Sequence, residues 1–428
     1  MSVKYRLIIM NFLQFAVWGA YLTSMGSYLV SVNQASHIGM FYAIQGIVSM
    51  FMPALIGIVA DRWVPAQKMY SFCHLVGGLF MLAAGYYGYT AGSGVEFPLL
   101  FTLYAFSVAF YMPTLALSNS VAYSILEKAG LDTIKAFPPI RIFGTIGFIC
   151  AMLFVDITGY QFTYAQFFTS GALGLLLAVY AFSAIPNIPV TSHKGEKKSL
   201  AESLGLDAFK LFKSRKMALF FIFSMLLGVS LQITNGFANP FITSFKAMPE
   251  FANSFGANHA NALISLSQIS ETLCILLIPF FLKKFGIKQV MLIAMVAWVL
   301  RFGLFGAGDP GPNVWMFILS MIVYGVAFDF FNISGSLFVD KETTPAIRSS
   351  AQGMFMLMTN GVGATVGTLG AQAVVNHFTY SKEYEGAFYT VGEWSTVWYI
   401  FAAYALVVAI LFALVFKYKH QPEKETKK

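Results

Sequence analysis

The most constraining feature of this sequence is a succession of long apolar runs separated by short polar loops. A run of about 20 apolar residues is long enough to cross a bilayer as a helix. Inside lipid, only helices and closed barrels satisfy all their backbone hydrogen bonds. Charged residues form 11% of the chain, against about 25% in soluble domains. The sequence therefore predicts an all-α polytopic membrane protein with twelve transmembrane helices.

The predicted spans form two groups of six. The first group covers residues 7–30, 38–60, 69–90, 97–124, 139–157 and 165–185. The second covers residues 217–244, 260–282, 289–307, 313–339, 349–375 and 395–416. We therefore expect an N-terminal six-helix bundle at 1–185, a cytoplasmic linker at 186–215, a C-terminal six-helix bundle at 216–417 and a cytoplasmic tail at 418–428. Two such halves match the major facilitator fold.

Positive charge alternates between successive loops. One set of loops, with both chain ends and the linker, holds most of the Lys and Arg, whereas the opposite loops hold only Lys246 and Lys382. Because cytoplasmic loops are enriched in Lys and Arg, we expect both termini in the cytoplasm. The net charge of +8 then reflects topology, and no nucleic-acid partner is expected.

A short motif closes the second predicted span. Its sequence, Gly57-Ile-Val-Ala-Asp61-Arg62, resembles the G-x-L-A-D-R signature of the major facilitator superfamily. This resemblance implies that Asp61 and Arg62 form a gate on the cytoplasmic side. The alternative is a basic turn that only sets topology.

Ionisable residues inside the predicted spans are few. Asp329 and Glu271 lie within the tenth and eighth spans, and Arg141 lies at the start of the fifth. A charge at the bilayer centre costs about 2.5–3.5 kcal/mol on insertion scales, so such residues are candidates for function. The alternative is an ion pair that only ties the bundle together. Arg301 lies toward one end of the ninth span, and we expect its side chain to extend to the interface.

Polar residues in the spans recur at helical spacing, which places them on common faces. The pairs are Arg141 with Thr145, Gln232 with Asn235, Gln268 with Glu271, and Asp329 with Asn332. Such pairs can join helices, but together they could also surround a neutral polar solute. The nearby rings of Phe148, Tyr324 and Phe328 could stack on a planar group.

Other kinds of chemistry have no counterpart in the sequence. It contains no Gly-rich phosphate loop, catalytic triad or metal-ligand cluster, so we expect neither an enzyme nor a cofactor or metal. His74, His259 and His377 are scattered, and we predict structural or solvated roles for them.

Several stretches carry a family resemblance through most of the chain. They are Phe137-Pro-Pro-Ile-Arg141-Ile-Phe-Gly-Thr-Ile-Gly-Phe148, Leu231-Gln-Ile-Thr-Asn235, Ser267-Gln-Ile-Ser-Glu271-Thr and Ala327-Phe-Asp329-Phe-Phe-Asn-Ile-Ser-Gly. These resemble the bacterial nucleoside:proton symporter family of the major facilitator superfamily. The resemblance implies proton-driven uptake of purine and pyrimidine nucleosides, such as uridine and adenosine, across the inner membrane. We expect a monomer in the lipid bilayer.

The resemblance also implies a set of nucleoside-contacting positions. They are Arg141, Thr145, Phe148, Gln232, Asn235, Gln268, Glu271, Tyr324, Phe328, Asp329 and Asn332. A symporter needs a group that takes up and releases a proton, which leaves Asp329 and Glu271, with Arg141 as counter-charge. The sequence does not decide between the two carboxylates. It also leaves open a major facilitator symporter for another polar solute, such as a sugar.

Overall fold

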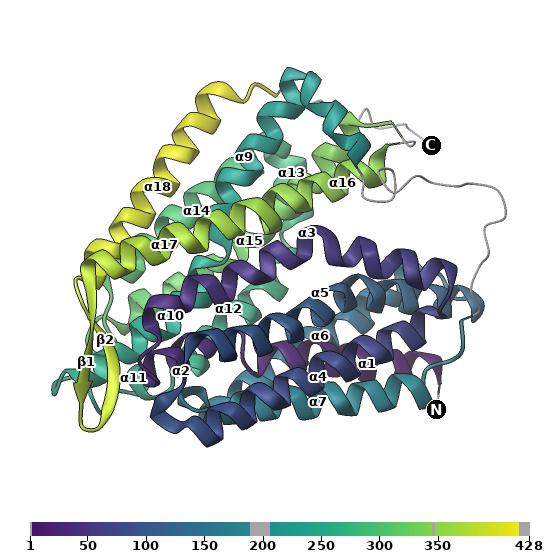
Figure 1. Ribbon diagram of the computed structural model, residues 1–428. Helices are drawn as coiled ribbons and strands as arrows, with labels where there is room; N and C mark the ends of the chain where they lie inside the picture. The colour runs from purple at the N-terminus through teal and green to yellow at the C-terminus, as the bar shows by residue number, and fades with distance from the viewer. Residues whose placement is uncertain (1, 189–205, 345–346, 419–428) are drawn as a thin grey trace.

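The computed structural model describes residues 2–188, 206–344 and 347–418, which form two helical bundles (Figure 1). The N-terminal bundle comprises α1 (Val3–Gly19), α2 (Met25–Ser31), α3 (Ile38–Arg62), α4 (Ala66–Ala91), α5 (Phe97–Lys128), α6 (Thr133–Ile157) and α7 (Ala165–Ser183). The C-terminal bundle comprises α9 (Arg215–Leu231), α10 (Ile233–Ser244), α11 (Phe255–Asn258), α12 (Ala260–Ile275), α13 (Ile278–Phe285), α14 (Ile287–Ala307), α15 (Val314–Glu342), α16 (Arg348–Met356), α17 (Ala364–Phe378) and α18 (Trp394–Val415).

The predicted count of twelve membrane spans is only partly reproduced. In the described residues, nine helical segments are long and apolar enough to cross a membrane, and the bent pair α12–α13 makes ten. The other two predicted spans coincide with α1–α2 and with α16–α17. Both regions are helical, but α1 and α2 are separated by a break, and a π-helix at Leu357–Gly363 separates α16 from α17.

Breaks also occur inside two spans of the C-terminal bundle. The seventh predicted span is interrupted at Gln232, between α9 and α10. The eighth is bent by 55° between α12 and α13. Interrupted helices free backbone polar groups, which membrane proteins tolerate where protein or a watery cavity surrounds them. The break at Gln232 therefore marks a part of the bundle suited to polar contacts.

The two bundles pack closely at one end because small residues meet there. A Cβ added at Gly26 of α2 would lie 2.4 Å from the carbonyl oxygen of Gly236 in α10. A Cβ added at Gly39 of α3 would lie 2.6 Å from the carbonyl oxygen of Thr368 in α17. Glycine at such contacts lets helix backbones approach. In Figure 1 the bundles diverge from this end toward the end that holds α16 and the start of α1.

A β-hairpin stands at the closely packed end (Figure 1). Strands β1 (Thr379–Tyr384) and β2 (Ala387–Gly392) pair antiparallel, with Thr379 opposite Gly392. The connecting turn has positive φ at Glu385 and Gly386. These strands were not predicted from the sequence.

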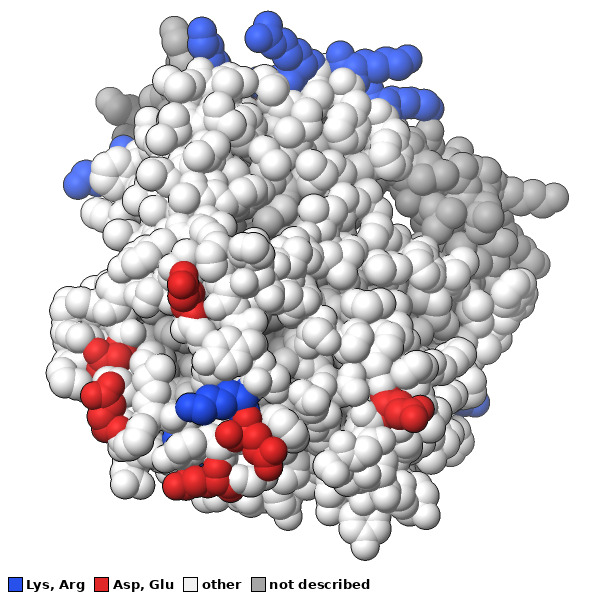
Figure 2. Space-filling view, turned by 60° about the vertical axis from the view of Figure 1, so that its left-hand side comes forward, with Lys and Arg blue, Asp and Glu red and all other residues white. Residues whose placement is uncertain are grey.

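Charges are divided between the ends of the molecule. On the face shown in Figure 2, Asp and Glu residues gather on the lower part, whereas Lys and Arg residues gather mainly along the upper rim. This division agrees with the alternation of loop charges in the sequence.

Candidate functional site

The N-terminal bundle contributes Arg141, Thr145 and Phe148, which lie on successive turns of α6. Helices α1 and α6 pack tightly, since a Cβ at Gly147 would lie 2.1 Å from the carbonyl oxygen of Phe12. This approach places the Arg141 guanidinium 3.9 Å from the centroid of the Phe15 ring. The Phe148 ring meets Trp18 edge-on at 6.3 Å. Arg141 is half-buried, so its charge can act on groups across the bundle interface.

The C-terminal bundle contributes both carboxylates from neighbouring helices. Helices α12 and α15 are in close contact, since a Cβ at Gly325 would lie 2.6 Å from the carbonyl oxygen of Ser270. This contact sets Glu271 and Asp329 within electrostatic range of one another. Glu271 also lies within electrostatic range of Arg141 from the other bundle. In the described residues, none of these three groups forms an ion pair within 4.0 Å.

Asp329 is the more isolated of the two carboxylates. Its side chain is 5% exposed, and its Oδ2 atom has no hydrogen-bond partner in the described structure. A buried polar group without a partner is unfavourable, and more so when it is charged. A proton or a polar ligand would relieve this condition.

Two aromatic rings follow the same face of α15. Tyr324 and Phe328 stack with their centroids 5.6 Å apart and an angle of 19° between their planes. Trp298 of α14 meets Tyr324 edge-on at 6.0 Å. Asn332, one turn further, donates its side-chain N–H to the backbone oxygen of Phe328. That hydrogen bond uses a donor of Asn332 that the sequence prediction assigned to a ligand.

Gln232 and Asn235 form a pair at the break between α9 and α10. The Asn235 amide donates to Gln232 Oε1 at 2.8 Å. In the described part of the chain, no hydrogen bond, ion pair or ring contact joins this pair to Thr145, Gln268 or the α15 residues. The structure thus brings Arg141, Glu271, Asp329 and the Tyr324–Phe328 stack into one region, and Asn332 is joined to this region through Phe328. In the described residues, no hydrogen bond links Gln232 or Asn235 to it, and the Phe148 ring contacts Trp18 instead of the α15 rings.

Asp61 and Arg62 end α3, but their side chains fall outside the described residues. Arg301 was expected to reach the interface, and that prediction is wrong. Its side chain is 2% exposed, because its guanidinium is held between α12 and α15 by Ser267 Oγ and the backbone oxygen of Ser320.

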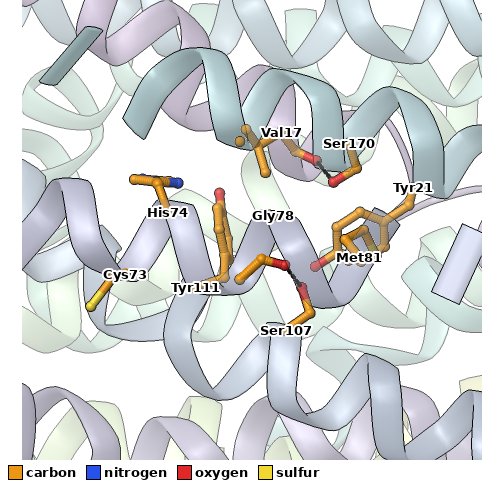
Figure 3. A pocket seen from close by; sticks show the side chains of 11 residues that line it. Val17, Tyr21, Cys73, His74, Gly78, Met81, Ser107, Tyr111 and Ser170 are labelled. Atoms are coloured by element: carbon orange, nitrogen blue, oxygen red, sulfur yellow. Dashed lines mark hydrogen bonds between the residues drawn. The ribbon is translucent and has the colours of Figure 1, made fainter. Parts of the chain in front are cut away.

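A small cavity lies within the N-terminal bundle, between α1, α4, α5 and α7 (Figure 3). Beside it, Gln14 Oε1 accepts hydrogen bonds from His74 Nε2 at 2.7 Å and from the Tyr70 hydroxyl at 2.6 Å. The Tyr21 hydroxyl also lines the cavity and is buried without a hydrogen-bond partner in the described structure. None of the eleven lining residues belongs to the predicted site, so we regard the cavity as part of the packing of this bundle.

A buried polar cluster joins the two bundles at the hairpin end, and we call it the outer cluster. It comprises Thr23, Ser27, Asp156 and Gln161 of the N-terminal half with Asn239, His259 and Asn261 of the C-terminal half. His259 Nδ1 lies 2.7 Å from Asp156 Oδ2. The sequence prediction for His259, a structural or solvated role, missed this contact because spacing along the chain does not reveal pairs 103 residues apart.

The outer cluster is continuous through its amides. Asn261 Oδ1 accepts from Asn239 Nδ2 at 2.7 Å and from the Thr23 hydroxyl at 3.0 Å. The Ser27 hydroxyl donates to Asn239 Oδ1 at 2.6 Å. In the described residues, every hydrogen bond between the two halves uses N-terminal-half residues 23–43 or 156–161. The halves are therefore fastened at the hairpin end.

Comparison with known proteins gives consistent matches over the full length. The family model described as "Nucleoside H+ symporter" matches residues 1–421. Xanthosine permease of Escherichia coli strain K12 is 48% identical over 427 residues, covering 99% of this chain and 98% of that protein. Nucleoside permease NupG of the same strain is 48% identical over 423 residues, covering 98% and 97%. A crystal structure of NupG superposes with a TM-score of 0.87 at 47% identity, covering 98% of this chain and all of that one.

Proposed function

The chain belongs to the nucleoside H+ symporter family, and from this premise we propose that it carries nucleosides and protons together across a bacterial inner membrane. The fold is that of a multi-pass transporter, and its relatives are transporters rather than enzymes. The observation that carries the proposal is the set of charges between the two halves. Arg141 from one half and Glu271 from the other attract one another. Asp329 lies within electrostatic range of Glu271, and its Oδ2 atom has no hydrogen-bond partner among the described residues.

We propose that the nucleoside binds among the eleven predicted residues. Arg141, Thr145 and Phe148 line it from α6, Gln232 and Asn235 from the α9–α10 break, Gln268 and Glu271 from α12, and Tyr324, Phe328, Asp329 and Asn332 from α15. Both halves contribute, so a single chain completes the site, which supports a monomeric transporter. The half-buried amides offer hydrogen bonds to ribose hydroxyls and base edges, and the Tyr324–Phe328 stack offers a surface for the base.

Asp329 is the better candidate for the proton carrier. Glu271 has the positive charge of Arg141 within electrostatic range, whereas the charge that acts on Asp329 is the like charge of Glu271. Two neighbouring carboxylates hold a proton between them more readily than either would alone. We propose that Asp329 binds the proton and that Glu271 connects it to Arg141, so that protonation changes the attraction between the halves.

The topology and domain limits remain those inferred from the sequence. The loop charges support cytoplasmic termini and a cytoplasmic linker at 186–215. The motif at Gly57–Arg62 supports a gate on the same side, formed by Asp61 and Arg62. Segments 1–185 and 216–417 would then be the two halves that move against one another.

The proposal is tested by uptake of labelled uridine, adenosine and xanthosine into proteoliposomes. We expect accumulation with an inward proton gradient, and loss of accumulation when an uncoupler removes the gradient. Unlabelled nucleosides should compete, and sugars should not. Xanthosine is included because a xanthosine permease and a nucleoside permease are equally identical to this chain. Competition by a sugar and not by any nucleoside would favour the other candidate, a sugar symporter.

A further inference from the structure

Arg301 is a buried cation outside the predicted site. It lies in α14, and its side chain ranks among the largest fully buried ones of the described structure. Its Nη1 atom donates to the backbone oxygen of Ser320 at 2.8 Å and to Ser267 Oγ at 3.4 Å. Its Nε atom has no hydrogen-bond partner among the residues that the structure describes. Among the described residues, no carboxylate lies within ion-pair distance of it.

Besides these hydrogen bonds, this cation lies over an aromatic ring. The Arg301 guanidinium carbon lies 4.5 Å from the centroid of the Tyr324 ring, and 5.4 Å from that of Phe305. A guanidinium over an aromatic face is attracted by the ring electrons, and the attraction grows when water is excluded. A charge buried in the membrane interior is costly. Arg301 is therefore a candidate for a functional role.

Tyr324 connects Arg301 to the candidate site. The residue lies within electrostatic range of Arg301, Glu271 and Asp329, and its ring stacks on Phe328. The Arg301 guanidinium thus contacts a ring that itself stacks on Phe328. We propose that Arg301 is a positioning residue for nucleoside binding, and that it acts through the Tyr324 ring. This inference rests on the proposed nucleoside symport.

A purely structural role would have a different signature. Arg301 also ties α14 to α15, because the Ser320 hydroxyl donates to the Arg301 backbone oxygen at 2.9 Å. If the residue served only this tie, its replacement would lower thermal stability and leave the affinity of the folded protein unchanged. A positioning role changes nucleoside affinity in protein that remains folded.

The experiment compares Arg301→Met, Arg301→Lys and Tyr324→Leu, with Arg301→Met/Tyr324→Leu as the double variant. Ser320→Ala is the matched control, because it removes a hydrogen bond between the same helices and leaves the guanidinium and its backbone partner in place. Uridine affinity is measured by calorimetry on detergent-purified protein, and KM and the maximal rate are measured in proteoliposomes. Melting temperature is recorded for every variant.

We expect Arg301→Met to weaken uridine binding roughly 5- to 30-fold, which corresponds to about 1–2 kcal/mol, with a matching rise in KM. Arg301→Lys should recover part of the loss because an ammonium also binds an aromatic face. In the Tyr324→Leu background, loss of Arg301 should cost little more, because the ring through which it acts is absent. Ser320→Ala should bind uridine as the wild type does.

Two results would overturn the inference. One is wild-type affinity in folded Arg301→Met, and the other is full additivity of the Arg301 and Tyr324 effects. If Arg301→Met does not fold, the same cycle with Arg301→Lys decides, since its smaller loss should also vanish in the Tyr324→Leu background. Wild-type protein that binds no nucleoside would instead refute the proposed function.

Discussion

At the scale of single residues, Asp329 and Glu271 share a site but differ in their neighbours. Replacing Asp329 with Asn mimics the protonated acid and cannot release a proton. We therefore expect this variant to bind uridine and to exchange it across the membrane, but to lose accumulation driven by the proton gradient. The measurement compares calorimetric affinity, counterflow of labelled uridine and gradient-driven uptake in the same preparation.

The matched variant is Glu271→Gln, in which the attraction between Glu271 and Arg141 is weakened. If Glu271 only connects the proton site to Arg141, this variant should slow transport and still accumulate uridine. Accumulation by Asp329→Asn with normal dependence on external pH would exclude Asp329 as the proton carrier. Loss of accumulation in Glu271→Gln alone would assign the proton to Glu271.

Gln232 and Asn235 are expected to exchange a contact with each other for contacts with the ligand. Each buried hydrogen bond left unpaired costs about 1–3 kcal/mol, so Gln232→Ala or Asn235→Ala should weaken uridine binding roughly 5- to 150-fold. Asn360→Ala is a suitable control, because its side chain contacts Met356 at an exposed position. Wild-type uridine affinity in both site variants would remove this pair from the binding site.

Single residues can be singled out from the sequence where their chemistry is unusual for a membrane interior. Asp329 and Glu271 stand out because a carboxylate is costly there, and the structure brings them together. The burial of Arg301 was not predictable from its position. An arginine whose side chain extends to the membrane interface and an arginine buried between helices can occupy the same position in one apolar span. Only the packing of α12, α14 and α15 decides between them.

At the scale of elements, hydropathy predicted where helices lie but not where they break. The interrupted regions contain polar residues, namely Thr23 and Ser24 before α2, Gln232 itself, and Thr359 and Asn360 in the π-helix. Polar residues such as Ser118 and Asn119 also occur in the unbroken helix α5, so composition alone does not mark a break. Breaks depend on which backbone groups find partners in neighbouring helices. The β-hairpin was missed because its strands lie in a polar loop whose pairing only the fold reveals.

Gly26 offers a test of the close contact between α2 and α10. A side chain there would collide with the carbonyl oxygen of Gly236 and with Pro240. We expect Gly26→Val to disfavour closure of the hairpin end and to lower the maximal uptake rate at least tenfold, with a smaller change in melting temperature. Thiol labelling of a cysteine placed at Thr23, in a background without the native cysteines, would report the opening.

Gly370→Val is the control for Gly26→Val, because no atom lies within 4 Å of a Cβ at Gly370. It should label and transport as the parent protein does. Equal uptake and equal labelling in the Gly26 and Gly370 variants would show that the contact between α2 and α10 does not limit transport.

At the scale of the whole molecule, the hydrogen bonds between the halves are asymmetric. In the described residues they lie toward the hairpin end, where the outer cluster bridges the bundles. The bundles diverge toward the end that holds α16 and the start of α1 (Figure 1). A transporter that alternates between two states must release one set of contacts to form the other. The two-bundle arrangement was predictable from the spans and the linker, but this asymmetry was not, because it depends on contacts between distant residues.

The outer cluster should therefore bias the equilibrium toward the state in which the hairpin end is closed. His259→Ala removes the contact to Asp156, whose side chain is buried, and leaves Gln161 as its partner. Hydrogen bonds to charged groups contribute about 1.5–3 kcal/mol. Because His259 is partly exposed, we expect a shift of about 1–2 kcal/mol, or roughly 5- to 30-fold in the ratio of open to closed states. Distances between spin labels on β2 and on the loop after α4 would measure that ratio.

His377→Ala provides the control, since His377 is exposed and its ring contacts only its neighbour Phe378 among the described residues. A loss of thermal stability without any change in the distance distribution would mean that the cluster supports the fold and does not set the balance between the two states.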